Sequence, residues 1–212
     1  MSMTRRTIAG VAATLLCLAA FGAQAQGAKA PEVLIKEVST DVLDAVKADK
    51  TIQAGDIRKV IALVDQKVLP YVNFQRMTSS AVGRYWRQAT PEQQKRLQEE
   101  FKLLLVRTYS GALSQVSSEQ TVELRPMRST PADNEVVVRT EIKGKGDPIQ
   151  LDYRLEKAGD SWKIYDVNVL GVWLVENYRN SFAQEIGANG IDGLIAKMAE
   201  RNKSAAAAGA KS

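Results

Sequence analysis

The chain has 212 residues, a formal net charge of +5, no histidine and a single cysteine, Cys17. Because no imidazole is present, the sequence excludes a Ser-His-Asp triad, a Cys-His pair and a histidine-ligated zinc site. A chain of this length forms one domain, or at most two small ones, and can bury a sizeable core.

The first 25 residues have the pattern of a secretory signal peptide. Arg5 and Arg6 precede an apolar stretch at 8–21, and Ala23-Gln24-Ala25 provides the small-x-small sequence before a cleavage site. The apolar stretch is shorter than the ~20 residues that a transmembrane helix needs. We therefore expect export to the periplasm, with Cys17 removed during processing, so that no disulfide bond stabilises the mature protein.

The first part of the mature chain has helical periodicity. Apolar residues at spacings of three and four predict a helix over 31–47 and a second one that opens at Gly55-Asp56 and ends before Pro70. A third helix is expected over 74–87. Thr90, Pro91 and Gln93 form the pattern of a capping box, which predicts a long helix that continues to about Leu113.

After Ser118 the apolar pattern changes to a period of two, which predicts β-strands. Gly-containing turns at 144–147 and 158–160 would join neighbouring strands as hairpins. The expected sheet is an antiparallel meander of about four strands, at 121–125, 136–142, 149–155 and 161–170. The fourth strand is apolar on both faces.

Two further helices are expected, from Val172 and from Ile191, and the small-residue segment 202–212 is expected to be a disordered tail. The predicted fold class is α+β, with helices packed on a curved antiparallel sheet. The predicted organisation is a cleaved signal peptide at 1–25, a single domain at 26–201 and the tail.

Several local motifs suggest chemistry that the context does not favour. Lys145 between two glycines joins two strands rather than opening a helix, which favours a hairpin over a phosphate site. The arginines and aromatic residues at 83–87 lie on different faces of a helix, so we expect no nucleic-acid binding. Asp166 lies in an apolar strand, where a carboxylate needs either an arginine partner or access to water.

The chain resembles the MlaC family of periplasmic phospholipid-binding proteins, also called the toluene-tolerance family. The resemblance extends in order from about 31 to 201, and one departure is Trp173, where the family pattern has a small residue. It is carried by Val-Leu-Pro-Tyr-Val at 68–72, Gly-Arg-Tyr-Trp at 83–86, Ala-Thr-Pro-Glu-Gln at 89–93, Phe101, 109–113, Trp-Lys-Ile-Tyr-Asp-Val at 162–167, Gly171-Val172 and Gly-Ile-Asp-Gly-Leu at 190–194.

This resemblance implies a fold similar to nuclear-transport-factor-2-like domains, which encloses an apolar pocket for acyl chains. It also implies a soluble shuttle for diacyl phospholipid, with no cofactor, no metal and no catalytic residues. Its partners would be an outer-membrane lipoprotein-porin complex and an inner-membrane ABC transporter with its periplasmic lipid-binding subunit, and the shuttle would help to maintain outer-membrane lipid asymmetry. We expect a monomer.

The lipid-binding residues are predicted from the inward-facing strand positions and the apolar helix stripes. The candidates are Leu105, Tyr109, Val136, Val138, Leu151, Tyr153, Trp162, Ile164, Val172, Val175 and Phe182. Each of them could equally belong to a solid core, because a filled core and a lipid-filled one have the same sequence pattern.

Two other functions stay open at this point. The first is a ketosteroid-isomerase-like enzyme, in which Asp166 would act as a base and Tyr153 or Tyr165 as an oxyanion donor. The second is an adaptor that binds proteins through its apolar helix faces.

Overall fold

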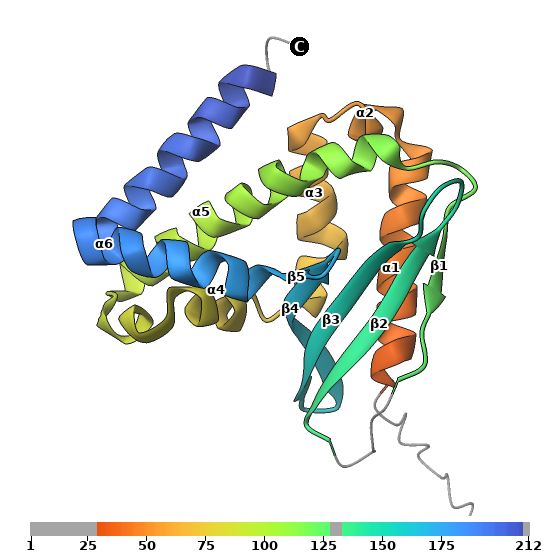
Figure 1. Ribbon diagram of the computed structural model, residues 1–212, viewed down its shortest axis with the longest axis horizontal. Coiled ribbons are helices and arrows are strands. Elements are labelled where there is room, and N and C mark those ends of the chain that lie inside the picture. Colours follow the sequence, from red (N-terminus) through yellow and green to blue (C-terminus); the bar gives the residue numbers. More distant parts are fainter. Residues whose placement is uncertain (1–28, 128–132, 210–212) are drawn as a thin grey trace, which may run out of the picture.

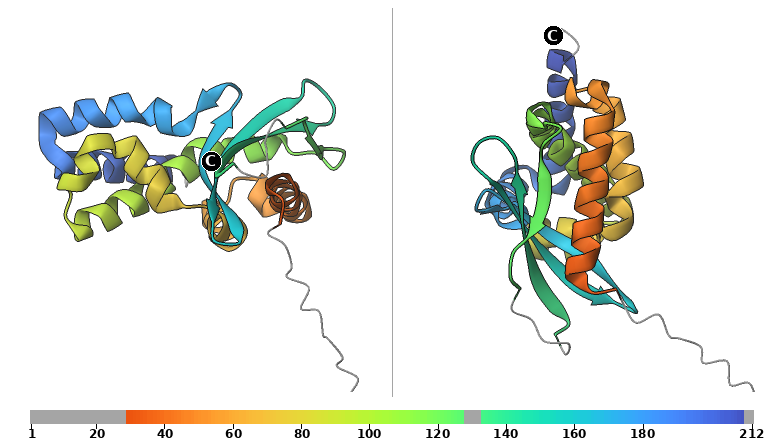
Figure 2. Two further views of the ribbon diagram at one scale, coloured as in Figure 1. Left: turned by 90° about the horizontal axis from the view of Figure 1, so that it is seen from below. Right: turned by 90° about the vertical axis from the view of Figure 1, so that its right-hand side faces the viewer.

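The computed structural model describes residues 29–127 and 133–209, and the predicted signal peptide lies outside these residues. An open, five-stranded antiparallel sheet stands at one side of the molecule, and the helices pack against one of its faces and extend beyond it (Figure 1). The architecture is therefore α+β, as predicted. Figure 2 shows that the long axis of the first helix runs beside the sheet.

Helices α1, α3, α4 and α5 begin within two residues of the positions that the sequence predicts. Their bounds are α1 Pro31–Ala48, α2 Lys50–Gln53, α3 Ile57–Lys67, α4 Phe74–Val82, α5 Pro91–Tyr109 and α6 Leu174–Gly209. The capping box at Thr90 is confirmed, because its side chain accepts a hydrogen bond from the backbone N–H of Gln93 and the Gln93 side chain returns one. The short helix α2 is not predicted by the sequence pattern.

Short 3₁₀ segments replace the ends of two predicted helices and follow a third helix. They are η1 Leu69–Tyr71, η2 Gly83–Gln88 and η3 Ser110–Gln115. The predicted helix over 74–87 ends earlier than expected because Gly83 has φ 65°, a conformation that stops an α-helix. The chain therefore turns sharply between α4 and η2.

The strands are β1 Thr121–Leu124, β2 Glu135–Lys143, β3 Ile149–Ala158, β4 Ser161–Val169 and β5 Val172–Trp173, in that order across the sheet. The predicted hairpins at Gly144 and Gly159 are present. Val172 was expected to open a helix, and this is wrong: a two-residue turn at Leu170 and Gly171, with φ 51° and 90°, returns the chain as the short strand β5.

A β-bulge divides strand β4. Leu155 pairs with Ile164 and Arg154 pairs with Asp166, which leaves Tyr165 as an extra residue. Because one extra residue reverses the alternation of side chains, Ile164 and Val167 point to the same face of the sheet. This explains why the strand looks apolar on both faces in the sequence.

Helix α6 bends at Gly190, which has φ 72°, and its second half folds back along α5 (Figure 1). The predicted disordered tail is wrong for 202–209, which are helical. Asn202 is 5% exposed and its amide donates hydrogen bonds to the backbone and the side chain of Glu100, so the start of this segment is fastened to α5. No helix in the described ranges is both long and apolar enough to cross a membrane.

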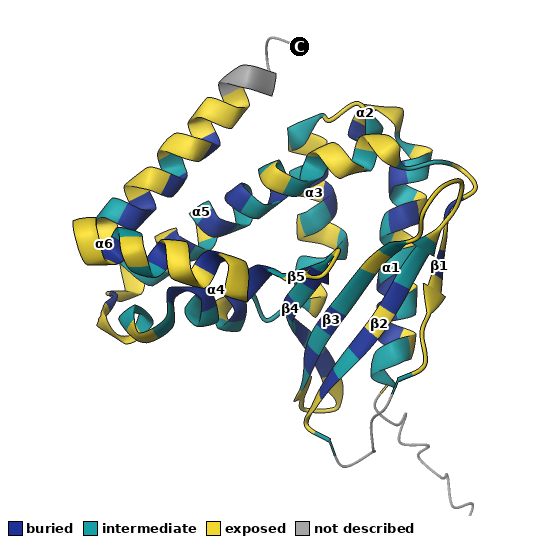
Figure 3. Ribbon diagram, viewed as in Figure 1, coloured by how far each residue is buried: buried dark blue, intermediate teal, exposed yellow. Residues whose placement is uncertain are grey.

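Three buried apolar clusters stabilise the fold, and the buried stripes of the helices face one another and the sheet (Figure 3). The first joins α4, α5 and α6, and in it Phe101 makes edge-on contacts with Tyr178 and Phe182. The second joins α1 to strands β2, β3 and β4. The third joins α1 and α2 to α3 and the end of α5.

Candidate lipid-binding site

An apolar cavity of about 380 Å³ lies between the sheet and the helices, where the three buried clusters meet. Its helical wall comes from α3, η1, α4, α5 and η3, and its other wall from the ends of β2, β3 and β4. Seventeen apolar and four polar residues form the lining: Val64, Val68, Leu69, Val72, Phe74, Met77, Leu105, Val106, Ala112, Leu113, Val116, Ile142, Ile149, Leu151, Val167, Val169 and Leu174, with Lys102, Tyr109, Gln115 and Gln120.

Local structure determines which side chains reach this cavity. Leu105 and Tyr109 are one helical turn apart on α5, so they lie on the same face of that helix. On the sheet, Val167 and Val169 face the cavity because the bulge at Tyr165 shifts the alternation of β4 by one residue. Most lining residues are only partly buried, as expected for side chains that face an open space.

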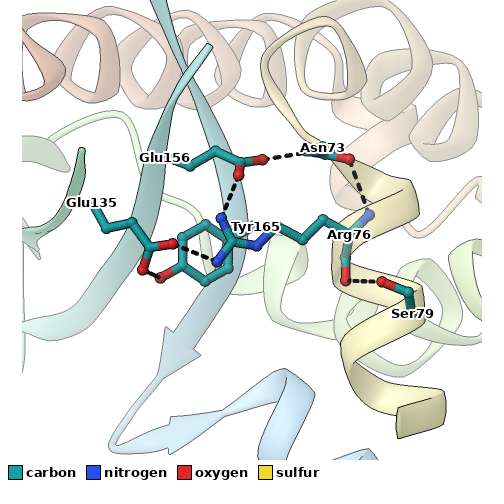
Figure 4. A network of polar contacts seen from close by, with 6 residues as sticks. All are labelled: Asn73, Arg76, Ser79, Glu135, Glu156 and Tyr165. Atoms are coloured by element: carbon teal, nitrogen blue, oxygen red, sulfur yellow. Dashed lines mark hydrogen bonds and ion pairs between the residues drawn. The ribbon is translucent and has the colours of Figure 1, made fainter. Parts of the chain in front are cut away.

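A polar clasp fixes α4 against the strands that frame the cavity (Figure 4). The Arg76 guanidinium forms ion pairs with Glu156 and, at 2.6 Å, with Glu135, and it lies 3.7 Å above the ring of Tyr165. Asn73 donates to Glu156 over 2.6 Å. The clasp holds the helix that supplies Phe74 to the cavity wall.

The predicted site residues fall into two groups. Leu105, Tyr109 and Leu151 line the cavity. The other eight lie elsewhere: Val136, Val138, Tyr153, Trp162 and Ile164 pack in the cluster with α1, Val175 and Phe182 pack in the cluster of α4, α5 and α6, and Val172 is 47% exposed on β5.

The sheet residues divide in this way because α1 covers one part of a face of the sheet, while another part of the same face borders the cavity. Helix α1 covers the part of β3 that carries Tyr153 and Leu155, whereas Leu151 on the same face packs against the edge of that cluster and borders the cavity. Alternation alone predicts a single surface and cannot show where one covering ends. The residues that the prediction omitted include Val64 and Val68, which lie on a helical stripe visible in the sequence.

Asp166 lies away from the cavity and has a structural environment. Its side chain is 1% exposed and accepts hydrogen bonds from Arg154 at 3.0 Å and from the backbone N–H groups of Val167 and Val175. Burial raises the pKa of the Asp166 carboxyl, and these three donors oppose that rise. The carboxylate thereby anchors the start of α6, and the predicted arginine partner is present.

The two tyrosines considered as oxyanion donors are also engaged elsewhere. The Tyr153 hydroxyl lies 3.2 Å from Ser39, and the Tyr165 hydroxyl donates to Glu135 over 2.9 Å. Neither residue lines the cavity. Trp173, the departure from the family pattern, is stacked under the Arg154 guanidinium at 3.9 Å and is also absent from the lining.

A larger hollow of about 930 Å³ lies on the opposite face of the sheet, but its chemistry is different. Its lining includes charged residues that pair across the strands, such as Arg139 with Asp152. Hydrocarbon gains little free energy from contact with such a surface, so the smaller apolar cavity is the candidate site for an apolar ligand.

Comparison with known proteins decides the family. The MlaC protein family matches residues 36–200, most of the chain. The chain belongs to the MlaC family. Over 198 residues the chain is 27% identical to the toluene tolerance protein Ttg2D of Pseudomonas putida, and the match covers 90% of this chain and 92% of that protein.

Two other proteins support the same assignment. The intermembrane phospholipid transport system binding protein MlaC of Haemophilus influenzae is 27% identical over 172 residues, covering 79% of this chain and 80% of that protein. A phospholipid-binding protein from Ralstonia solanacearum, solved in complex with a phospholipid, is 45% identical with a TM-score of 0.79, covering 82% of this chain and 98% of that one. This chain and the Ralstonia solanacearum protein therefore share the same α+β fold.

Proposed function

We propose that this protein is a periplasmic phospholipid carrier, which binds the acyl chains of its cargo in the apolar cavity between α3, α5 and the sheet. The observation that carries the proposal is the composition of this cavity, in which seventeen of the lining residues are apolar. The similarity to a protein solved with a phospholipid supports the identity of the cargo.

Energetics explain why such a carrier has to enclose the tails. Each methylene that leaves water gains about 0.8 kcal/mol, so a diacyl lipid with roughly 30 methylenes resists entering water by more than 20 kcal/mol in gross terms. Release into the aqueous phase is therefore too slow to be useful. The cargo has to pass directly into the apolar path of a docked acceptor.

We further propose that the donors and acceptors are an outer-membrane lipoprotein-porin complex and an inner-membrane ABC transporter with its periplasmic lipid-binding subunit. The family supports this, since one relative is named as the binding protein of an intermembrane phospholipid transport system. A passive carrier has no preferred direction of its own, so an energy-using partner would set the direction of transport.

Extraction of the purified protein tests this function. The protein is treated with organic solvent and the extract is analysed by mass spectrometry for phospholipid per mole of protein. A carrier yields stoichiometric phospholipid, and Leu105→Glu should lose it because a carboxylate in the cavity opposes burial of the tails. The control is Val33→Glu, which adds the same charge at a residue on α1 that is 42% exposed.

The outcomes separate the candidate functions. A protein that carries no lipid and takes none up from vesicles is not a carrier. Equal lipid in Leu105→Glu and Val33→Glu, with both folded, would place the tails somewhere other than this cavity.

A further inference from the structure

The cavity has four polar side chains in its lining, and three of them are already engaged. The Lys102 ammonium forms an ion pair with Asp65 at 2.8 Å. The Gln120 amide oxygen accepts a hydrogen bond from the backbone N–H of Ser117, and its residue is 9% exposed. Gln115 is exposed to solvent and its amide lies 3.5 Å from the hydroxyl of Ser114.

The fourth, Tyr109, differs from these three. Its hydroxyl makes no hydrogen bond with any residue in the described ranges, although Tyr109 lines the cavity. Tyr109 is the last residue of α5 and is partly buried, so the side chain lies between the apolar interior and the solvent. A phenol suits such a boundary because its ring is apolar and its hydroxyl needs a partner.

We propose that the Tyr109 hydroxyl donates a hydrogen bond to an acyl ester carbonyl of the bound phospholipid. This inference rests on the proposed function and adds a positioning residue to it. It specifies how deep the cargo enters: the ester groups stop at the end of α5, and only hydrocarbon continues past Leu105.

The chemistry of a phospholipid favours the ester over its other acceptors. The ester carbonyls are the first polar groups above the acyl chains, so they reach the edge of an apolar cavity when the tails are buried. The charged phosphate stays in water, since the cation in the lining, Lys102, is paired with Asp65. An ester carbonyl only accepts hydrogen bonds, and a protonated phenol can donate one.

The protonation state of Tyr109 is compatible with this role. Burial raises the pKa of the Tyr109 phenol, and the neighbouring Tyr178 hydroxyl raises it further. The group is therefore a neutral donor throughout the pH range in which the protein would work.

The test compares two ligands and two proteins. A diester phospholipid and its diether analogue, with the same chains and head group, are titrated into lipid-free protein; the diether lacks both carbonyls. We expect the wild-type protein to bind the diester about fivefold more tightly, which corresponds to the ~1 kcal/mol of a net hydrogen bond. Tyr109→Phe should weaken diester binding by the same factor and leave diether binding unchanged, so that the preference disappears.

Tyr85→Phe is the matched control, since it removes the same atom from a tyrosine whose hydroxyl contacts Arg84 outside the cavity. It should keep the fivefold preference. If Tyr109→Phe weakens both lipids equally, or changes neither, the hydrogen bond to the ester is refuted while the carrier function stands. If the wild-type protein binds neither lipid, the carrier function itself fails and this inference fails with it.

Discussion

Two leucines on strand β3 provide a direct test of whether the cavity is real. Leu155 is 0% exposed and packs in the cluster with α1, whereas Leu151, four residues earlier on the same face, borders the cavity. Truncation to alanine removes the same atoms at both positions. The consequences should differ, because one side chain is surrounded by protein and the other is not.

The magnitudes follow from what each leucine touches. Leu155→Ala leaves a void in a close-packed region and should lower the free energy of unfolding by about 3–5 kcal/mol. Leu151→Ala enlarges a space that already exists, so only part of the transfer free energy is lost, about 1–2 kcal/mol. The effects on phospholipid affinity should have the opposite order. Leu151→Ala should weaken phospholipid binding roughly 5- to 30-fold, and Leu155→Ala should leave it unchanged.

Urea unfolding of the lipid-free variants measures the first difference, and titration with a fluorescent phospholipid measures the second. The reasoning is refuted if the two substitutions cost the same in the lipid-free protein and Leu151→Ala binds lipid normally. Leu151 would then be an ordinary core residue.

Other substitutions probe the surroundings of the site. Val138→Glu should abolish folding, as seen by circular dichroism, because it buries an unpaired carboxylate at a residue that is 1% exposed, whereas Leu151→Glu should fold and lose its lipid. Asp166→Ala should lower the free energy of unfolding by about 3 kcal/mol in a urea titration, because the hydrogen-bond donors around the buried carboxylate lose their acceptor. A loss below about 1 kcal/mol would contradict the anchoring role of Asp166. Hydrogen bonds from Arg76, and then from the Tyr165 hydroxyl, hold the pKa of the Glu135 carboxyl below its ordinary value. The ionised Glu135 carboxylate therefore stabilises the fold at every pH above its pKa in the unfolded chain, and this stabilisation is lost as the pH falls through its pKa in the folded protein. Arg76→Met should therefore return the Glu135 pKa toward normal in an NMR titration, and an unchanged value would count against the clasp.

Local signals predicted most of the fold. The capping box at Thr90 and the turn at Gly159 depend on a few neighbouring residues, so the sequence contains the information directly. The strand β5 was missed because Val172 continues the apolar stripe of α6, and a non-glycine residue at positive φ, Leu170, has no clear signal in the sequence.

The site was harder to predict than the fold. Inward-facing positions such as Val138 and Leu151 have the same apolar character, and their difference depends on whether α1 extends far enough to cover them. The bulge at Tyr165 also made the site harder to predict, because it shifts the alternation of β4 by one residue and so places Ile164 and Val167 on the same face of the sheet. Such facts depend on long-range packing, which periodicity does not encode.

The packing of α1 on the sheet also bears on the order in which the protein folds. Helix α1 precedes the sheet in the chain, but its apolar residues Leu34, Ile35 and Val38 are covered by strands that continue to Ile164. The helix can therefore be enclosed only when the chain as far as Ile164 is available to fold. The strands pair with their neighbours in sequence and can form hairpins quickly once they appear. Helix α1 is therefore among the last elements to be enclosed, and its apolar face is the surface that a chaperone would have to protect.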